Sequence, residues 1–181
     1  MRFKVPIVLA LLSTGCTLFP RRVRLNYSPS KNVERHARQN ELEMTTFLDK
    51  RRDRSSFGHA SVLLEMGSQP IRPSGDTVKW LTQAASAELA AAGYQTSGAG
   101  RMKVGGALEE VACGSGKRTI CTVRLEAWVT MKDGWQVLKQ SYTGEGLRPP
   151  LFGEDPYELS LQEALRDCMA AFRRDVERLV P

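Results

Sequence analysis

The chain has few of the residues from which metal and acid–base centres are built. Its 181 residues include only two histidines, His36 and His59, and four cysteines with no Cys-x-x-Cys spacing, which argues against a zinc site and imidazole catalysis. No Gly-x-Ser-x-Gly motif occurs, so a nucleophile elbow is not indicated. Gly98-Ala-Gly100 lacks the last glycine of a dinucleotide-binding loop. We therefore predict a non-enzymatic protein with no catalytic residue, metal or cofactor.

Long apolar runs are also missing, and the run at the N-terminus is short. Val5–Leu12 is apolar apart from Pro6, whereas a helix that spans a bilayer needs about twenty apolar residues. Arg2 and Lys4 precede this run and small residues follow it. A basic head, a short apolar stretch and small residues before a cleavage site are typical of a secretory signal. The basic residues and Pro6 disfavour the alternative, a buried N-terminal strand or helix.

Ser13-Thr14-Gly15-Cys16 resembles the lipobox of bacterial lipoproteins, with Ser13 where leucine is usual. The resemblance implies a signal peptide over residues 1–15 and acylation of Cys16, including palmitate-type chains, after cleavage. Three acyl chains hold a protein on a bilayer almost permanently, because each buried methylene contributes about 0.8 kcal/mol. Thr17 replaces the aspartate of inner-membrane retention signals. We therefore expect an outer-membrane anchor and a domain that faces the periplasm.

Positive charge is concentrated early in the mature chain. Loss of Arg2 and Lys4 with the leader lowers the formal net charge from +6 to +4. Arg21, Arg22 and Arg24 follow the anchor, and such residues attract anionic headgroups at about 1 kcal/mol each near a bilayer. Nucleic acid also binds basic segments, but a secreted chain rarely meets it, so we predict no nucleic-acid partner. A solvated basic tether without a specific lipid contact is an equally good interpretation.

Residues 16–41 are polar, so we predict that they are a lipidated N-terminus and a flexible tether before a domain over residues 42–181. Within that domain, Leu42–Leu48 and Ser61–Met66 are expected strands, and a turn cluster fills residues 70–75. A helix begins after the N-cap Asp76 and ends at Gly93, which favours a Schellman closure.

Three further strands are expected at Met102–Cys113, Thr119–Met131 and Trp135–Gly144, the last two joined by an Asp133-Gly134 turn. Asp155 caps a final helix, along which apolar residues recur at helical spacing. The apolar stripe consists of Leu161, Leu165, Cys168, Phe172, Val176 and Leu179. The order β-β-α-β-β-β-α predicts an α+β fold with an antiparallel or mixed sheet of about five strands and both helices on one face.

Cys113 and Cys121 flank a turn-like stretch centred on Lys117. A hairpin there places the two cysteines directly opposite each other, and a disulfide is favoured over two free thiols in an oxidising compartment. The same register sets Glu109 opposite Leu125, which is an unfavourable pairing.

Three large apolar residues are predicted on the sheet face opposite the helices. The strand register sends Trp128 and Val137 to that face, with Trp135 beside them at the turn. Such a surface needs a cover, either from the tether or from another chain. We predict a partner-binding surface for a protein, an envelope polymer or a second copy of the chain. In that case Trp128→Ser disrupts association and leaves thermal unfolding nearly unchanged.

Two other function classes remain open. Asp49 and Asp53 would serve an envelope hydrolase or transferase if they converged with His59 in a cleft, although the surrounding basic residues favour ion pairs. A small-molecule or lipid carrier would need an apolar pocket between sheet and helices.

The arrangement resembles the YajG-like family of uncharacterised bacterial lipoproteins. The resemblance rests on the lipobox, on Phe47-Leu48-Asp49-Lys50-Arg51 with Gly58 downstream, on the Val78–Gly93-Tyr94 helix, and on the later strands and final helix. It covers Leu42 to Leu179 and implies a lipid-anchored periplasmic α+β domain without catalytic residues or a substrate. The sequence thus predicts an accessory or assembly protein of the outer membrane.

Overall fold

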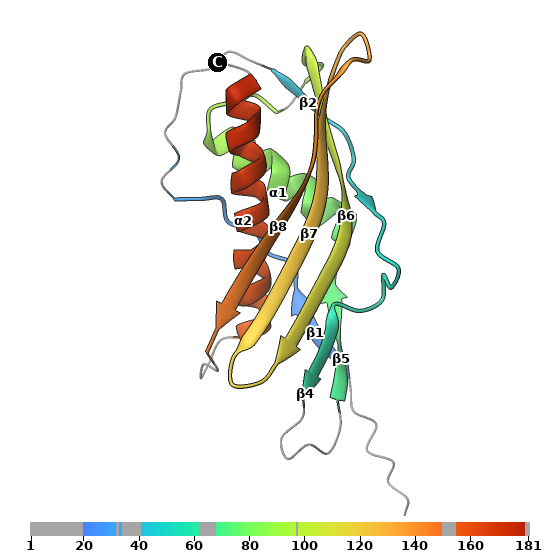
Figure 1. Cartoon of the computed structure of the whole chain (residues 1–181), viewed down its shortest axis with the longest axis vertical. Helices are drawn as coiled ribbons and strands as arrows, with labels where there is room; N and C mark the ends of the chain where they lie inside the picture. Colours follow the sequence, from blue (N-terminus) through green and yellow to red (C-terminus); the bar gives the residue numbers. More distant parts are fainter. Residues whose placement is uncertain are drawn as a thin grey trace, which may run out of the picture.

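The computed structural model describes residues 20–31, 33, 41–61, 68–96, 98–149 and 155–179. The predicted signal peptide, the lipidation site Cys16 and His36 lie outside these ranges. Figure 1 shows a tall, curved sheet with a long helix lying along one face. The α+β class is therefore confirmed.

The described residues form a mixed sheet of eight strands in the order β1-β5-β4-β6-β7-β8, with β2 and β3 also paired to β6. The strands are β1 (Arg21–Arg24), β2 (Leu42–Met44), β3 (Leu48–Asp49), β4 (Gly58–Ser61), β5 (Ser68–Ser74), β6 (Met102–Ser115), β7 (Thr119–Met131) and β8 (Gln136–Arg148). The helices are α1 (Thr77–Ala91) and α2 (Pro156–Leu179). The sheet is antiparallel from β6 to β8, whereas β1 runs parallel to β5 and β2, β3 and β4 run parallel to β6.

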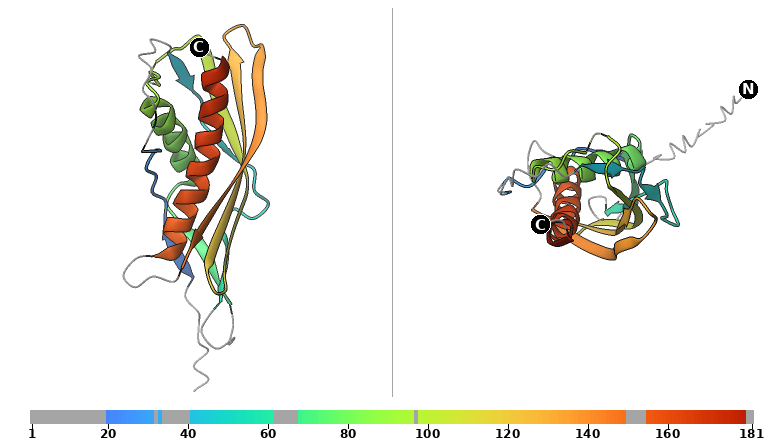
Figure 2. Two further views of the ribbon diagram at one scale, coloured as in Figure 1. Left: turned by 60° about the vertical axis from the view of Figure 1, so that its left-hand side comes forward. Right: turned by 90° about the horizontal axis from the view of Figure 1, so that it is seen from above.

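Both helices lie on the same side of the sheet, as the sequence predicts, with α1 beside α2 (Figure 2). The helix α1 begins and ends where its caps indicate. The Asp76 carboxylate accepts hydrogen bonds from two first-turn N–H groups at 2.8 and 3.1 Å. At the other end Gly93 has φ 97°, and the Tyr94 N–H donates to the Leu89 carbonyl at 3.2 Å. The predicted Schellman closure is confirmed.

The helix α2 packs closely on β8 and β7 through the predicted apolar stripe. The stripe is buried from Leu161 to Val176, and Leu179 is 40% exposed at the last turn. Gly144 and Gly146 on β8 permit the close approach, because a Cβ at either position would overlap a carbonyl oxygen of α2.

The three long strands follow the predicted register except at two irregularities, between Leu108 and Glu110 and between Val129 and Thr130. Val129 lies opposite Leu138, and Cys113 lies opposite Cys121. The expected pairing of Glu109 with Leu125 is wrong, because a bulge between Leu108 and Glu110 shifts β6 by one residue. Leu108 therefore faces Leu125, and Glu109 forms a 3.1 Å salt bridge with Arg124 instead.

The prediction of a flexible tether is wrong for residues 20–31. β1 pairs with β5 through Arg21–Ile71 to Arg24–Ser74, and Val23 is 1% exposed. The Asn26 carbonyl accepts a 3.0 Å hydrogen bond from the Trp80 indole of α1. Alternating apolar side chains in a basic segment supply the burial that fixes it to the domain.

The early strands also differ from the prediction. The expected turn cluster at residues 70–75 is mostly β5, which pairs with β4 over Ser68–Pro70 and with β1 over Ile71–Ser74. Each half of β5 therefore pairs with a strand on one side only, and proline is tolerated where one side of a strand is unpaired. Leu42–Leu48 divides into β2 and β3, with the buried Phe47 between them. Of the predicted strand Ser61–Met66, only Ser61 is described, and it ends β4.

Candidate functional site

One row of residues crosses the sheet at the end where the β6–β7 hairpin turns. Each member of the row pairs with the next across neighbouring strands, in the order Pro70, His59, Gly114, Ile120 and Leu147. The neighbouring row contains Cys121, whose side chain is fully buried. Because side chains alternate along a strand, Ile120 points to the opposite, outer face.

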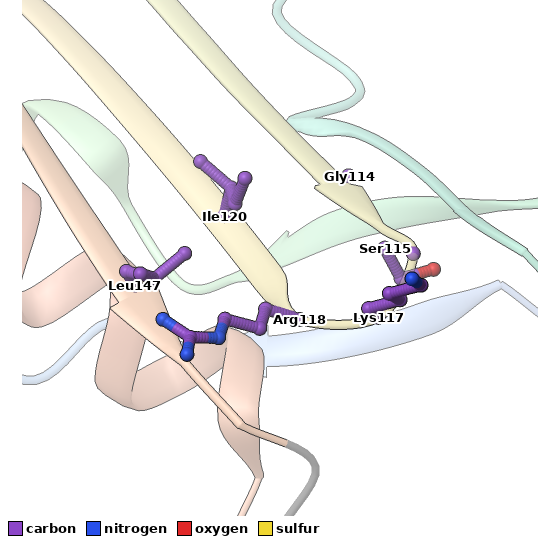
Figure 3. Close-up of a pocket in the computed structure, with 7 residues that line it drawn as sticks. Gly114, Ser115, Lys117, Arg118, Ile120 and Leu147 are labelled. Carbon is purple, nitrogen blue, oxygen red and sulfur yellow. The ribbon is translucent and has the colours of Figure 1, made fainter.

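Ile120 and Leu147 are 42% and 38% exposed. Figure 3 shows them on neighbouring strands, with Arg118 extending from the turn toward the end of β8. Together with the hairpin they line a hollow of about 480 Å³. We call its lining the hairpin-end surface, which consists of Gly114, Ser115, Gly116, Lys117, Arg118, Ile120 and Leu147.

A disulfide between Cys113 and Cys121 supports this surface, as the sequence predicts. The two cysteines are directly paired across β6 and β7, one position from the Gly114–Ile120 pair. Closing so short a loop stabilises the fold by roughly 2–3 kcal/mol in the chain-entropy estimate. The disulfide thus fixes the base of the hairpin that carries Lys117 and Arg118.

Positive charge at this end is only partly neutralised. Arg21 forms a 3.0 Å salt bridge with Asp155, and Arg148 forms one of 3.3 Å with Glu163. Within the described residues, the exposed Lys117 and Arg118 form no salt bridge.

Arg22 and Arg72 add to this charge, because they are paired neighbours on β1 and β5 and both are exposed. Of the three predicted membrane-proximal arginines, Arg22 thus stays solvent-facing. Arg24 is also exposed, and its backbone N–H donates a 2.9 Å hydrogen bond to the Glu158 carboxylate.

The structure does not gather the predicted partner-binding residues into one surface. Trp128 is half-buried over Gly105, where an added Cβ would meet its ring and the Thr45 hydroxyl. Val137 is half-buried against the core. Trp135 is 71% exposed at the β7–β8 turn, at the other end of the strands from the hairpin-end surface.

The predicted carboxylate loop is likewise divided. Asp53 and His59 line a second, polar cleft of about 340 Å³. Asp49, however, is engaged by the Arg51 guanidinium at 3.0 and 2.8 Å. Hydrogen bonds from Ser55 hold the pKa of Asp53 below its ordinary value, so this exposed carboxyl is ionised and poorly suited to donate a proton.

Arg51, which also lines this cleft, serves the fold. Arg51 is 5% exposed and lies 4.6 Å from the Phe57 ring centre. Its guanidinium also donates to the Ser56 carbonyl at 2.9 Å. Arg51 therefore fixes the loop rather than offering a free cation to a substrate.

Sequence reasoning missed the hairpin-end surface. Ile120 is an apolar residue at an outward position of β7. Its place in the alternating pattern of that strand was the sequence signal that could have revealed the surface. Leu147 lies beyond the predicted end of the last strand, which the structure extends to Arg148.

The fold defines a two-layer α+β domain, and the first two of the following solved structures share it. Protein XCC0632 from Xanthomonas campestris, of family DUF330, superposes with a TM-score of 0.57 at 11% identity, covering 89% of this chain and 98% of that one. An uncharacterized protein gives 0.51 at 10% identity, covering 90% and 99%. Lipoprotein GNA1162 from Neisseria meningitidis gives 0.34 at 10% identity, covering 77% and 99%.

At these identities the first two structures share the fold alone. No family model and no curated protein matches the sequence. The resemblance to YajG-like lipoproteins therefore stays a sequence-based prediction. Among the described residues, no helix has the length and apolar character needed to cross a membrane.

Proposed function

We propose that this protein is a lipoprotein of the bacterial outer membrane, acylated at Cys16, whose periplasmic domain has a non-enzymatic accessory role. A YajG-like affiliation is part of this proposal. The observation that carries it is the position of the first described strand. β1 starts at Arg21, five residues after Cys16. Every described strand and helix therefore lies within the mature chain that cleavage before Cys16 would leave.

The domain acts in this proposal by binding a protein or an envelope polymer, and Trp135 is its main contact. An indole that is 71% exposed is a large apolar group for a free surface. Trp128 and Val137 are half-buried, so they support the sheet beneath the contact more than they form it.

Capture of partners from envelopes with the acylated full-length chain tests this role. Trp135→Ser should abolish partner recovery and leave thermal unfolding unchanged. Leu48→Ser is the matched control, because Leu48 is an exposed apolar residue on β3, at 49% exposure. Equal recovery with wild type and Trp135→Ser would contradict the contact. Sedimentation of the purified chain distinguishes a second copy from a different partner.

An envelope hydrolase or transferase has weaker support. Asp53 and His59 share the polar cleft, but Asp49 is held by Arg51. Conversion of an envelope substrate that Asp53→Asn abolishes, without loss of folding, would favour this alternative.

A further inference from the structure

We propose that the hairpin-end surface rests on the bilayer that holds acylated Cys16, with anionic phospholipid headgroups as its ligand. This inference rests on the anchor in the proposed function. It adds which end of the domain touches the membrane and through which residues.

The covalent chain limits where the anchor can lie. Three residues separate Cys16 from Pro20, and a fully extended chain spans at most about 3.6 Å per residue, so their Cα atoms lie within about 14 Å. Pro20 directly precedes Arg21, which pairs with Ile71. Pro20 is therefore level with Pro70, at one end of the row that also contains Ile120 and Leu147.

This row is short compared with the height of the sheet. Neighbouring strands lie about 4.8 Å apart, so Leu147 is roughly 20 Å from Pro70 along the row. The far ends of β6 and β7 lie about 40 Å away, at about 3.3 Å per residue. The short link keeps the Pro70 end of the row near the bilayer. Leu147, at the other end of the row, reaches the bilayer when the row lies along the membrane surface, whereas Trp135 reaches it only if the whole domain lies flat.

The chemistry of the hairpin-end surface suits a membrane interface. Two exposed aliphatic side chains, Ile120 and Leu147, flank the hollow, and Lys117 and Arg118 extend from its rim. Apolar groups beside basic ones are typical of proteins that bind the headgroup region. Arg22 and Arg72 are adjacent like charges, an arrangement that costs free energy unless an anion neutralises it.

The middle of the sheet's outer face differs, because its charges are neutralised internally. Glu126 forms salt bridges with Lys139 at 3.1 Å and with Lys50 at 3.5 Å. Arg124 likewise pairs with Glu110 at 3.1 Å. Binding of anionic lipid at the middle of the sheet would therefore contribute little electrostatic free energy. This favours contact at the hairpin end.

Photo-crosslinking of the acylated full-length chain tests the contact. A p-benzoylphenylalanine replaces either Leu147 or Trp135, and the protein is placed in vesicles of phosphatidylcholine and phosphatidylglycerol. Mass spectrometry should find phospholipid adducts mainly at Leu147. Equal adducts at both positions, adducts mainly at Trp135, or protein adducts alone at Leu147 would overturn the inference.

The charge contribution is tested with a matched pair of double variants. Lys117→Gln with Arg118→Gln removes two charges at the hairpin end, and Arg101→Gln with Lys132→Gln removes two exposed charges at the far end. At about 1 kcal/mol per residue, or about fivefold each, the first pair should lower Leu147 adducts up to about 25-fold. The second pair should leave them unchanged. An equal decrease with both pairs would indicate diffuse attraction and overturn the proposed contact.

Intact-mass measurement of the protein distinguishes a failure of the proposed anchor from a failure of the proposed membrane contact. An unmodified Cys16 would overturn the anchor and this inference together. An acylated Cys16 without phospholipid adducts at Leu147 would overturn only the inference and leave the proposed function standing.

Discussion

The hydroxyl of Tyr27 donates a 2.7 Å hydrogen bond to the Glu88 carboxylate, which is 1% exposed inside the fold. The same carboxylate accepts the Ser30 N–H at 3.0 Å and the Arg173 guanidinium at 3.2 Å. Burial, and then the neighbouring Glu88, raise the pKa of Tyr27 above its ordinary value, so the phenol stays protonated as a donor. This cluster joins the segment after β1 to α1 and α2.

Loss of the Tyr27 hydroxyl should therefore weaken the fold. We expect Tyr27→Phe to lower the free energy of unfolding by about 1.5–3 kcal/mol, the usual range for a hydrogen bond to a charged group. Glu88→Ala should cost more, about 3–5 kcal/mol, because it removes the acceptor of three hydrogen bonds, although Arg173 keeps its 2.8 Å salt bridge with Glu177. Urea denaturation measures both. A Tyr27→Phe protein as stable as wild type would show that the segment is not fixed by this bond.

Close packing of α2 on β8 gives a second prediction. An added methyl at Gly146 would overlap the Ser160 carbonyl, whereas nothing lies within 4 Å of a Cβ at Gly114. Gly146→Ala should destabilise by about 1–3 kcal/mol or more, as overpacking does. Gly114→Ala is the control and should change stability by less than about 0.5 kcal/mol. Similar midpoints for both variants in chemical denaturation would refute the close approach.

The buried thiol of Cys168 predicts a pH dependence. Burial raises its pKa to about 12 from 9.0. Below pH 9 both states hold the proton, so the native state keeps its full stability. Between pH 9 and 12 the unfolded chain loses the proton first, and stability falls by about 1.4 kcal/mol per unit.

Tyr27 and Tyr142 also have raised pKa values, but from an ordinary value of 10.0. The loss of stability between pH 9 and 10 therefore belongs mainly to Cys168. Denaturation of wild type and Cys168→Ala at pH 8, 9 and 10 separates the contributions. If the alanine variant shows the same early decrease, the thiol is not its cause.

Trp128 and Trp135 should respond differently to truncation. Trp128 is half-buried across Gly105, so Trp128→Ser should lower stability by about 1–2 kcal/mol through lost apolar burial. This differs from the sequence-based expectation of nearly unchanged unfolding. The exposed Trp135 should tolerate serine within about 0.5 kcal/mol. Thermal unfolding compares the variants, and equal losses would contradict the placement of Trp128.

Features set by neighbouring residues could be predicted from the sequence. Asp76 and Gly93 bound α1 because capping depends on a few consecutive residues. The Asp133-Gly134 turn and the Cys113–Cys121 pair lie in two hairpins, so the register of the long strands followed. The bulge at Glu109 could not be predicted from the sequence, because it depends on packing along the whole strand.

Features that join distant segments could not be predicted. β1 pairs with β5 about fifty residues later in the sequence, and basic residues and prolines obscured both strands. The burial of Glu88 depends on Tyr27 and Arg173, which come from other elements. The hairpin-end surface was missed for a related reason, because apolar exposure is defined only once the rest of the chain is placed.

The anchor is the central claim, and intact-mass measurement of the native chain from bacterial envelopes tests it most directly. We predict a mature protein that begins at Cys16 and carries a diacylglyceryl group and an N-linked acyl chain. A chain that retains residues 1–15, or one that begins at an unmodified Cys16, would contradict the account.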